Sequence, residues 1–129
     1  RYRAEEVRYE LGEDVCRISM DIAKAYPDDR IHSYTRSAVL DKEKSITIRD
    51  HYEGDGGTAV LSLMFCEKPS IHQNTIGIGD LGICTVEGAS SITSEEIPVT
   101  DERLKTAWKH SLYRCLVTME ARDLTLTIA

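Results

Sequence analysis

Pairs of cysteine or histidine at the short spacing of zinc fingers and ribbons do not occur in this sequence. The four cysteines, Cys16, Cys66, Cys84 and Cys115, lie far apart along the chain. Cys16 and Cys115 alternate with apolar residues as in strands, so we predict that the cysteines are free, buried thiols that pack as small hydrophobic residues. This pattern leaves the cellular compartment open.

Clusters of basic residues are also missing. The formal net charge is -6 at pH 7, and the 16 Lys and Arg residues are spread along the chain. Little in this pattern would attract a phosphate backbone, so we expect no nucleic-acid partner. No apolar run approaches the roughly 18 residues of a membrane-spanning helix. The longest run, residues 60–66, is interrupted by Ser62, and we expect no membrane span.

The sequence has no motif for nucleophilic catalysis or for phosphate binding. A GxSxG stretch is absent. The glycines of residues 54–57 and 77–82 fall outside a strand-to-helix GxGxxG frame and are typical of hairpin turns. The histidines share no spacing that would direct them at one metal ion; they are His32, His51, His72 and His110. We therefore expect no cofactor in this segment, although distant strands can bring ligands together.

Most segments alternate between apolar and polar residues with a period of two, which predicts β-strands. Examples are residues 14–22, 45–53, 111–121 and 123–129. Turn-forming residues separate such segments at roughly the 8- to 12-residue spacing of an all-β sandwich. The predicted fold is an antiparallel β-sandwich of about nine to ten strands, with residues 1–129 as a single domain.

Two segments depart from this alternation. Residues 58–67 are apolar on both faces, which predicts a central strand that is covered on both sides. Residues 101–109 carry Leu104 and Trp108 at the i, i+4 spacing of a helix, with Thr100 as a candidate cap. We expect at most one short helix, packed on the sandwich at residues 101–109.

Two charges lie on the apolar sides of neighbouring predicted strands. Arg36 shares its side with Leu40, and Asp50 shares its side with Ile46. If both apolar sides face the core, Arg36 lies directly opposite Asp50 with a five-residue loop, or diagonal to it with a three-residue loop. Arg can make a two-pronged contact with a carboxylate, and a carboxylate held in this way is a poor catalytic base. We predict a structural pair that fastens the two strands.

The aromatic residues suggest a second kind of site. β-Sandwiches commonly hold glycans on exposed aromatic side chains, and Tyr26, Tyr34 and Trp108 are the candidate glycan contacts. Because aromatic residues make up 6% of the chain, core or edge packing is their more common use. An autonomous carbohydrate-binding module is therefore kept as the alternative function.

Three stretches carry a resemblance to a known family. Residues 20–53 contain an Ala-Tyr-Pro group that leads into the strand of Arg36 and then into a strand closing on Asp50. Residues 95–117 and the opening residues 2–10 match further segments in the same order. Together these stretches resemble the C-terminal β-sandwich of the heparinase II/III-like family of bacterial polysaccharide lyases.

The resemblance implies that the chain is the C-terminal part of a longer lyase whose chemistry lies elsewhere. Relatives cleave uronic-acid polysaccharides by β-elimination, with Tyr and His groups of an N-terminal α/α toroid that this sequence does not contain. We expect a non-catalytic domain that packs against the toroid and helps to wall the cleft for an acidic polysaccharide such as a glycosaminoglycan. The isolated segment should be inactive, and the parent protein periplasmic or secreted.

The resemblance also implies zinc in the parent protein. The family stretch that carries a zinc-ligand histidine has no counterpart in this sequence, and Met64 and Cys66 stand where relatives often place another histidine. Asp21 is the residue that best matches a leftover metal ligand, although a structural role on a surface strand is the simpler expectation for it.

Overall fold

The computed structural model describes residues 2–108 and 110–129, within which eleven strands form two antiparallel sheets. The strands are β1 (Glu5–Leu11), β2 (Val15–Asp21), β3 (Ile31–Asp41), β4 (Ser45–Gly54), β5 (Val60–Phe65), β6 (Ser70–His72), β7 (Thr75–Gly77), β8 (Ile83–Glu87), β9 (Ala89–Pro98), β10 (Ser111–Met119) and β11 (Asp123–Ile128). The long sheet has the order β1-β2-β3-β4-β11-β8-β7-β6, and the short sheet has the order β5-β10-β9. The predicted all-β sandwich is confirmed, and the three-residue strands β6 and β7 raise the strand number above nine or ten.

The core lies where the two sheets face each other. Its most buried side chains come from β7 and β8, from β11 of the long sheet, and from β10 of the short sheet; they are Ile76, Cys84, Val86, Cys115, Val117, Met119, Leu124 and Leu126. On β10 and β11 the buried residues alternate with less buried ones. This is the period-two pattern of a strand with one face toward a core, so the sequence pattern and the packing agree.

The chain passes from the long sheet to the short sheet at Gly88, the residue between β8 and β9. Gly88 has a positive φ of 86°, and a side chain at this position would run into the carbonyl of Asp123. Both observations require glycine, because other residues pay a steric cost in this conformation. Gly88 therefore makes the sharp corner that places β9 and β10 over the long sheet.

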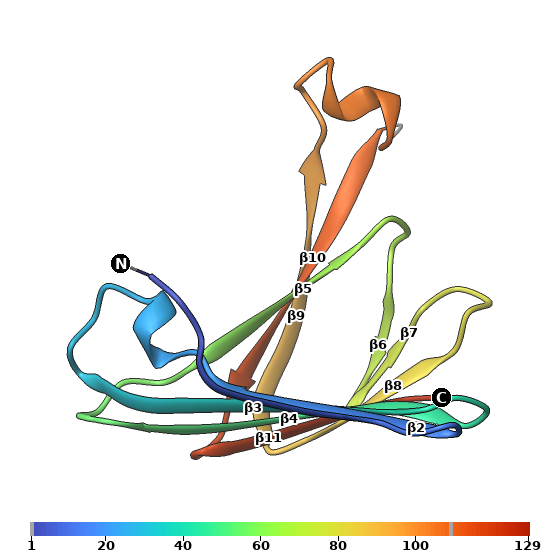
Figure 1. Ribbon diagram of the computed structural model, residues 1–129. Coiled ribbons are helices and arrows are strands. Elements are labelled where there is room, and N and C mark those ends of the chain that lie inside the picture. Colours follow the sequence, from blue (N-terminus) through green and yellow to red (C-terminus); the bar gives the residue numbers. More distant parts are fainter. Residues whose placement is uncertain (1, 109) are drawn as a thin grey trace.

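The short sheet covers only part of the inner face of the long sheet. In Figure 1, β5, β9 and β10 cross the long sheet at a steep angle, and residues 99–108 lie at the end that stands away from it. One row of residues that lie opposite one another on neighbouring strands shows how the exposure of this face changes across the sheet. It runs through Tyr9, Ile18, Ala38, Ile48 and Leu126, and exposure falls from 74% at Tyr9 to 1% at Leu126.

The uncovered end of this face is apolar. Its exposed side chains come from β1, β2 and the hairpin end of β3 and β4, and they are Tyr9, Leu11, Ile18, Leu40 and Ile46. We call these five residues the uncovered patch. They carry the inward alternation of core residues, yet no part of the described chain lies over them.

The prediction for residues 58–67 is wrong in its placement. The strand β5 is an edge strand of the short sheet, paired only with β10 among the described strands. Leu61 and Leu63 pack toward the core, whereas Val60 and Met64 point outward and are about half exposed. The apolar residues on the outer side of β5 therefore form a second exposed apolar surface. The sequence pattern shows which side of a strand is apolar, but not whether that side is covered.

The predicted helix at residues 101–109 is a single 3₁₀ turn, Leu104–Thr106. Residue 109 lies outside the described residues. Asp101 rather than Thr100 starts the turn, since its carboxylate accepts the backbone N–H of Arg103 at 2.8 Å. Trp108 is 41% exposed, so this segment is not a helix packed on the sandwich. A second 3₁₀ turn, Ala23–Ala25, was not predicted, and no helix in the described chain is long and apolar enough to cross a membrane.

The cysteines are free, as predicted, but they are not all buried. Cys84 and Cys115 are buried in the core, Cys16 is half-buried, and Cys66 is exposed. Cys66 follows the last residue of β5 and continues the outward side of Met64, so neither its position nor its parity directs it to the core. The prediction of a buried thiol is therefore wrong for Cys66.

Reaction with a thiol reagent should follow this burial. In the native protein Cys66 should react first and Cys16 more slowly, while Cys84 and Cys115 resist, because burial raises the pKa of both thiols. After denaturation without reductant all four should react. Peptide mass spectrometry over a time course measures this order. A disulfide, or reaction of Cys115 as fast as Cys66, would contradict the packing.

Candidate functional site

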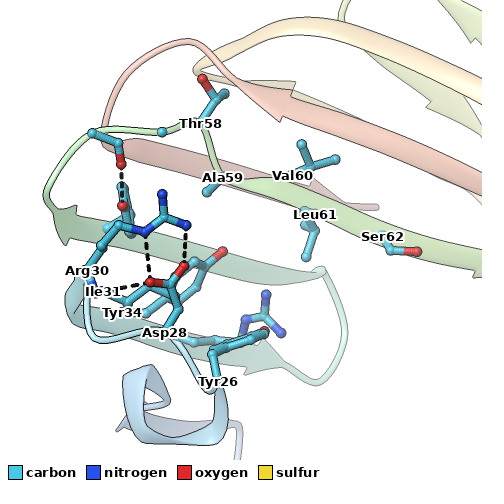
Figure 2. A pocket seen from close by; sticks show the side chains of 14 residues that line it. Tyr26, Asp28, Arg30, Ile31, Tyr34, Thr58, Ala59, Val60, Leu61 and Ser62 are labelled. Atoms are coloured by element: carbon cyan, nitrogen blue, oxygen red, sulfur yellow. Dashed lines mark hydrogen bonds and ion pairs between the residues drawn. The ribbon is translucent and has the colours of Figure 1, made fainter.

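A cavity of about 530 Å³ opens between the two sheets at the N-terminal end of β3, which begins at Ile31. Figure 2 shows the segment from Thr58 to Ser62 on one side, and Tyr26, Asp28 and Arg30 on the other. Its aromatic and charged lining residues are Tyr26, Asp28, Arg30, Tyr34, Arg36 and Tyr52. We call this site the tyrosine–arginine cavity.

The inner face of the β3–β4 hairpin forms the floor of the cavity. In the register of this hairpin, Leu40 lies opposite Ile46 and Arg36 lies directly opposite Asp50. Arg36 holds Asp50 with both prongs, Nε to Oδ1 at 2.7 Å and Nη2 to Oδ2 at 2.6 Å. The hydroxyl of Tyr34 also donates to Asp50 Oδ2, at 2.8 Å.

Burial differs between the two members of this pair. The side chain of Asp50 is 1% exposed, whereas that of Arg36 is 34% exposed. Hydrogen bonding to Asp50 raises the pKa of Arg36 above its ordinary value, so the guanidinium stays charged. Asp50 is thus a buried charge that depends on Arg36 and Tyr34, while Arg36 keeps one edge toward the cavity.

Three tyrosines lie in a row along the cavity. The ring centroids of Tyr26 and Tyr34 are 6.3 Å apart, as are those of Tyr34 and Tyr52. Tyr52 donates its hydroxyl to the carbonyl of Gly56 at 2.8 Å, which ties the β4–β5 connection to the floor. Tyr26 is 48% exposed and Tyr34 is buried, so Tyr26 is the ring of this row that a ligand could cover.

An ion pair shapes the rim of the cavity. Arg30 Nε and Nη2 contact the two carboxylate oxygens of Asp28 at 2.9 and 2.7 Å, and the backbone N–H of Arg30 donates to the same carboxylate. These hydrogen bonds lower the pKa of Asp28 to about 2. The pair is therefore ionised at neutral pH and holds the loop before β3 in a fixed turn.

The sequence named Tyr26, Tyr34 and Trp108 as candidate glycan contacts, and the structure brings the two tyrosines together in this cavity but not Trp108. Trp108 lines two other cavities beside Cys66, at the far end of the short sheet. Tyr52 and Arg30 were missed. The signal for Tyr52 was present, because it shares the side of Asp50 and pairs with Tyr34 across the hairpin.

Asp21 uses its carboxylate for local structure. Oδ1 accepts the backbone N–H groups of Ala23 and Tyr34, and Oδ2 accepts the hydroxyl of Ser33. Burial opposes ionisation of Asp21, but these hydrogen bonds outweigh it and lower its pKa. Within residues 2–108 and 110–129, no three His, Cys, Asp or Glu side chains are grouped so that they could hold a metal ion. The residues around Asp21 therefore do not fit a zinc site.

The lining of the cavity includes side chains that suit binding better than proton transfer. Burial, followed by the hydrogen bond to Asp50, raises the pKa of Tyr34, so the phenol keeps its proton at neutral pH and is a poor base. Asp50 is occupied by Arg36 and Tyr34. The groups with free capacity are the exposed ring of Tyr26 and the cavity edge of Arg36, which suit recognition of a ligand.

Comparison with known proteins shows the fold. No family model and no curated protein matches the sequence. The structure is similar to crystal structures of the heparan sulfate lyase HepC from Pedobacter heparinus and of a mutant of that enzyme, with TM-scores of 0.61 and 0.62 and 13% sequence identity. Each match covers 98% of this chain and 21% of the lyase chain, so this chain spans about a fifth of that enzyme.

Substitution of the buried pair should lower stability unequally. Arg36→Ala leaves Asp50 as a buried, uncompensated charge and should lower the free energy of unfolding by about 3–5 kcal/mol. Asp50→Ala leaves Arg36 able to reach water and should cost about 1–3 kcal/mol. The double variant should cost less than the sum of the two. Urea unfolding followed by circular dichroism measures all three values.

Arg49→Ala is the matched control, because Arg49 is an exposed arginine on β4, next to Asp50 in the same hairpin. It should change the free energy of unfolding by less than about 0.5 kcal/mol. If Arg36→Ala unfolds at the same urea concentration as Arg49→Ala, the pair does not fasten the hairpin.

Proposed function

We propose that the chain is a non-catalytic all-β domain of a heparinase II/III-like polysaccharide lyase. In this role it packs against the catalytic toroid of the same protein and forms part of the wall of the substrate cleft. The uncovered patch on the long sheet carries the proposal. Likeness in fold to a heparan sulfate lyase, over about a fifth of that enzyme, supports it.

The uncovered patch has the composition of an interface rather than of a free surface. Tyr9 and Leu11 on β1 are 74% and 76% exposed, and Ile18, Leu40 and Ile46 continue the same face. Together with Cys16 and Ala38 they line an apolar hollow of about 360 Å³. A contiguous apolar surface of this kind is typical of a contact with another domain or protein.

The patch is also continuous with an existing interface. The cross-strand row that begins at Tyr9 and Ile18 ends at Leu126 in the core. A partner lying over the patch would therefore extend the layer that the short sheet begins. An interface within one protein fits this arrangement, because it would extend a core that the chain already has.

The cavity is consistent with a non-catalytic role in the wall of the substrate cleft. Tyr34 keeps its proton and Asp50 is held by Arg36, so neither suits proton abstraction next to a uronate carboxylate. An autonomous carbohydrate-binding module is the second candidate, favoured by the exposed ring of Tyr26 at the cavity. That alternative predicts no partner for the uncovered patch.

A charged side chain introduced into the uncovered patch should distinguish a docked lyase domain from an autonomous carbohydrate-binding module. Ile18→Arg should leave the melting temperature of the isolated chain within a few degrees, since the side chain is already 39% exposed. In the full-length parent protein the same change should uncouple this domain, which would appear as a separate, earlier transition in calorimetry. Ile83→Arg is the control, because Ile83 is 56% exposed and alternates with the buried Cys84. Equal behaviour of the two variants in the parent protein would contradict the interface.

The isolated chain should not cleave polysaccharide. Incubated with heparin, heparan sulfate or alginate, it should give no rise in the absorbance of the unsaturated uronate that β-elimination produces. The reason is that its cavity offers no free base beside the bound sugar. Turnover that is lost on substitution of one of the four histidines would show a catalytic site in this chain and overturn the proposal.

A further inference from the structure

We propose that the tyrosine–arginine cavity binds one acidic sugar unit, with the ring of Tyr26 against the sugar and the outward edge of Arg36 on its carboxylate or sulfate. This inference rests on the proposed function for the identity of the polysaccharide. It goes further by assigning a binding site, with Arg36 as the residue that binds the anionic group and Tyr26 as the residue that stacks on the sugar ring.

The first argument is charge. The charged side chains among the described residues that line the cavity are Arg30, Arg36 and Asp28, which gives two positive charges and one negative charge. Asp50 lies beneath the floor and is 1% exposed. When Asp50 is counted, the two arginines are matched by two carboxylates, but the carboxylate paired with Arg36 lies beneath the floor while the outer edge of the guanidinium faces the cavity. An exposed guanidinium edge of this kind favours an anionic group over a neutral one at that point of the cavity.

The second argument is the geometry of Arg36. An arginine has five N–H donors, and Asp50 uses the Nε and one Nη2 donor. The remaining donors lie on the edge that is exposed at the cavity, since the side chain is 34% exposed and lines it. Asp50, which also accepts the hydroxyl of Tyr34, holds the guanidinium from behind, so little side-chain entropy is lost when an anion binds to the free edge.

The third argument is shape. Tyr26 presents a ring that is 48% exposed and is backed by Tyr34 at 6.3 Å. The segment from Thr58 to Ser62 forms the opposite wall (Figure 2), and the cavity volume of about 530 Å³ lies within the range of small-molecule sites. A sugar ring could therefore lie between an aromatic face and a wall that is apolar at residues 59–61, with the hydroxyl residues Thr58 and Ser62 at its two ends.

Titration of the ¹⁵N-labelled chain with tetrasaccharides followed by NMR tests this assignment. Three ligands of equal length separate the chemistries: a sulfated heparan sulfate fragment, an unsulfated oligouronate and a neutral glucan. Both acidic ligands should shift the signals of Tyr26, Arg36 and residues 56–62, more weakly as salt increases, and the glucan should bind at least tenfold more weakly. Binding of the sulfated ligand alone would assign the anion as sulfate.

Two variants and a control make the test specific. Tyr26→Ala should weaken binding of the acidic ligands at least tenfold, whereas Trp108→Ala, which removes an exposed aromatic residue outside the cavity, should change it less than twofold. Asp28→Asn removes the one negative charge of the lining and should tighten binding of the acidic ligands severalfold without affecting the glucan. This variant detects the charge effect without disturbing the buried pair.

The outcomes separate this inference from the proposed function. Equal affinity for the glucan, shifts centred on Trp108, or no binding at all would overturn the cavity assignment. None of these results bears on the uncovered patch, which is tested by the Ile18→Arg variant in the parent protein. Conversely, a cavity that binds acidic sugar in a chain whose patch has no partner would favour an autonomous binding module.

Discussion

The two-pronged bond between Arg36 and Asp50 is the interaction on which the rest of the structure depends. Asp50 is a carboxylate on the inner face of a sheet, 1% exposed, and burial of a lone charge there would be strongly unfavourable. The register that places it opposite Arg36 is therefore the register that the hairpin can adopt. The same register puts Leu40 and Ile46 side by side, and it puts Tyr34 beside Tyr52.

Two surfaces follow from this one hairpin, at its two ends. At the open end, Tyr34, Tyr52 and the free edge of Arg36 line the cavity that the β4–β5 connection closes. At the turn end, Leu40 and Ile46 continue the apolar face onto β2 and β1, beyond the reach of the short sheet. The long sheet thus carries the tyrosine–arginine cavity and the uncovered patch on one face, which is the arrangement that the proposed function requires.

The fold class could be predicted from the sequence because alternation with a period of two records one buried face per strand, as on β10 and β11. Whether an apolar face is covered depends on the other layer, which alternation does not record. Val60 and Met64 on an edge strand and the exposed Cys66 are the cases where this mattered. The cavity was only partly predictable: Tyr26 and Tyr34 were named from the sequence, but Arg30 reaches the cavity from a loop whose turn depends on its contact with Asp28.

The most direct measurement of the interface is the alkylation rate of Cys16, whose side chain lines the hollow of the uncovered patch. The rate is measured by peptide mass spectrometry in the isolated chain and in the intact parent protein, each normalised to the same thiol after denaturation. A domain that packs over the patch should slow Cys16 at least tenfold in the parent protein. Equal normalised rates would show that the patch stays open to solvent, and would contradict a role as a docked domain of a lyase.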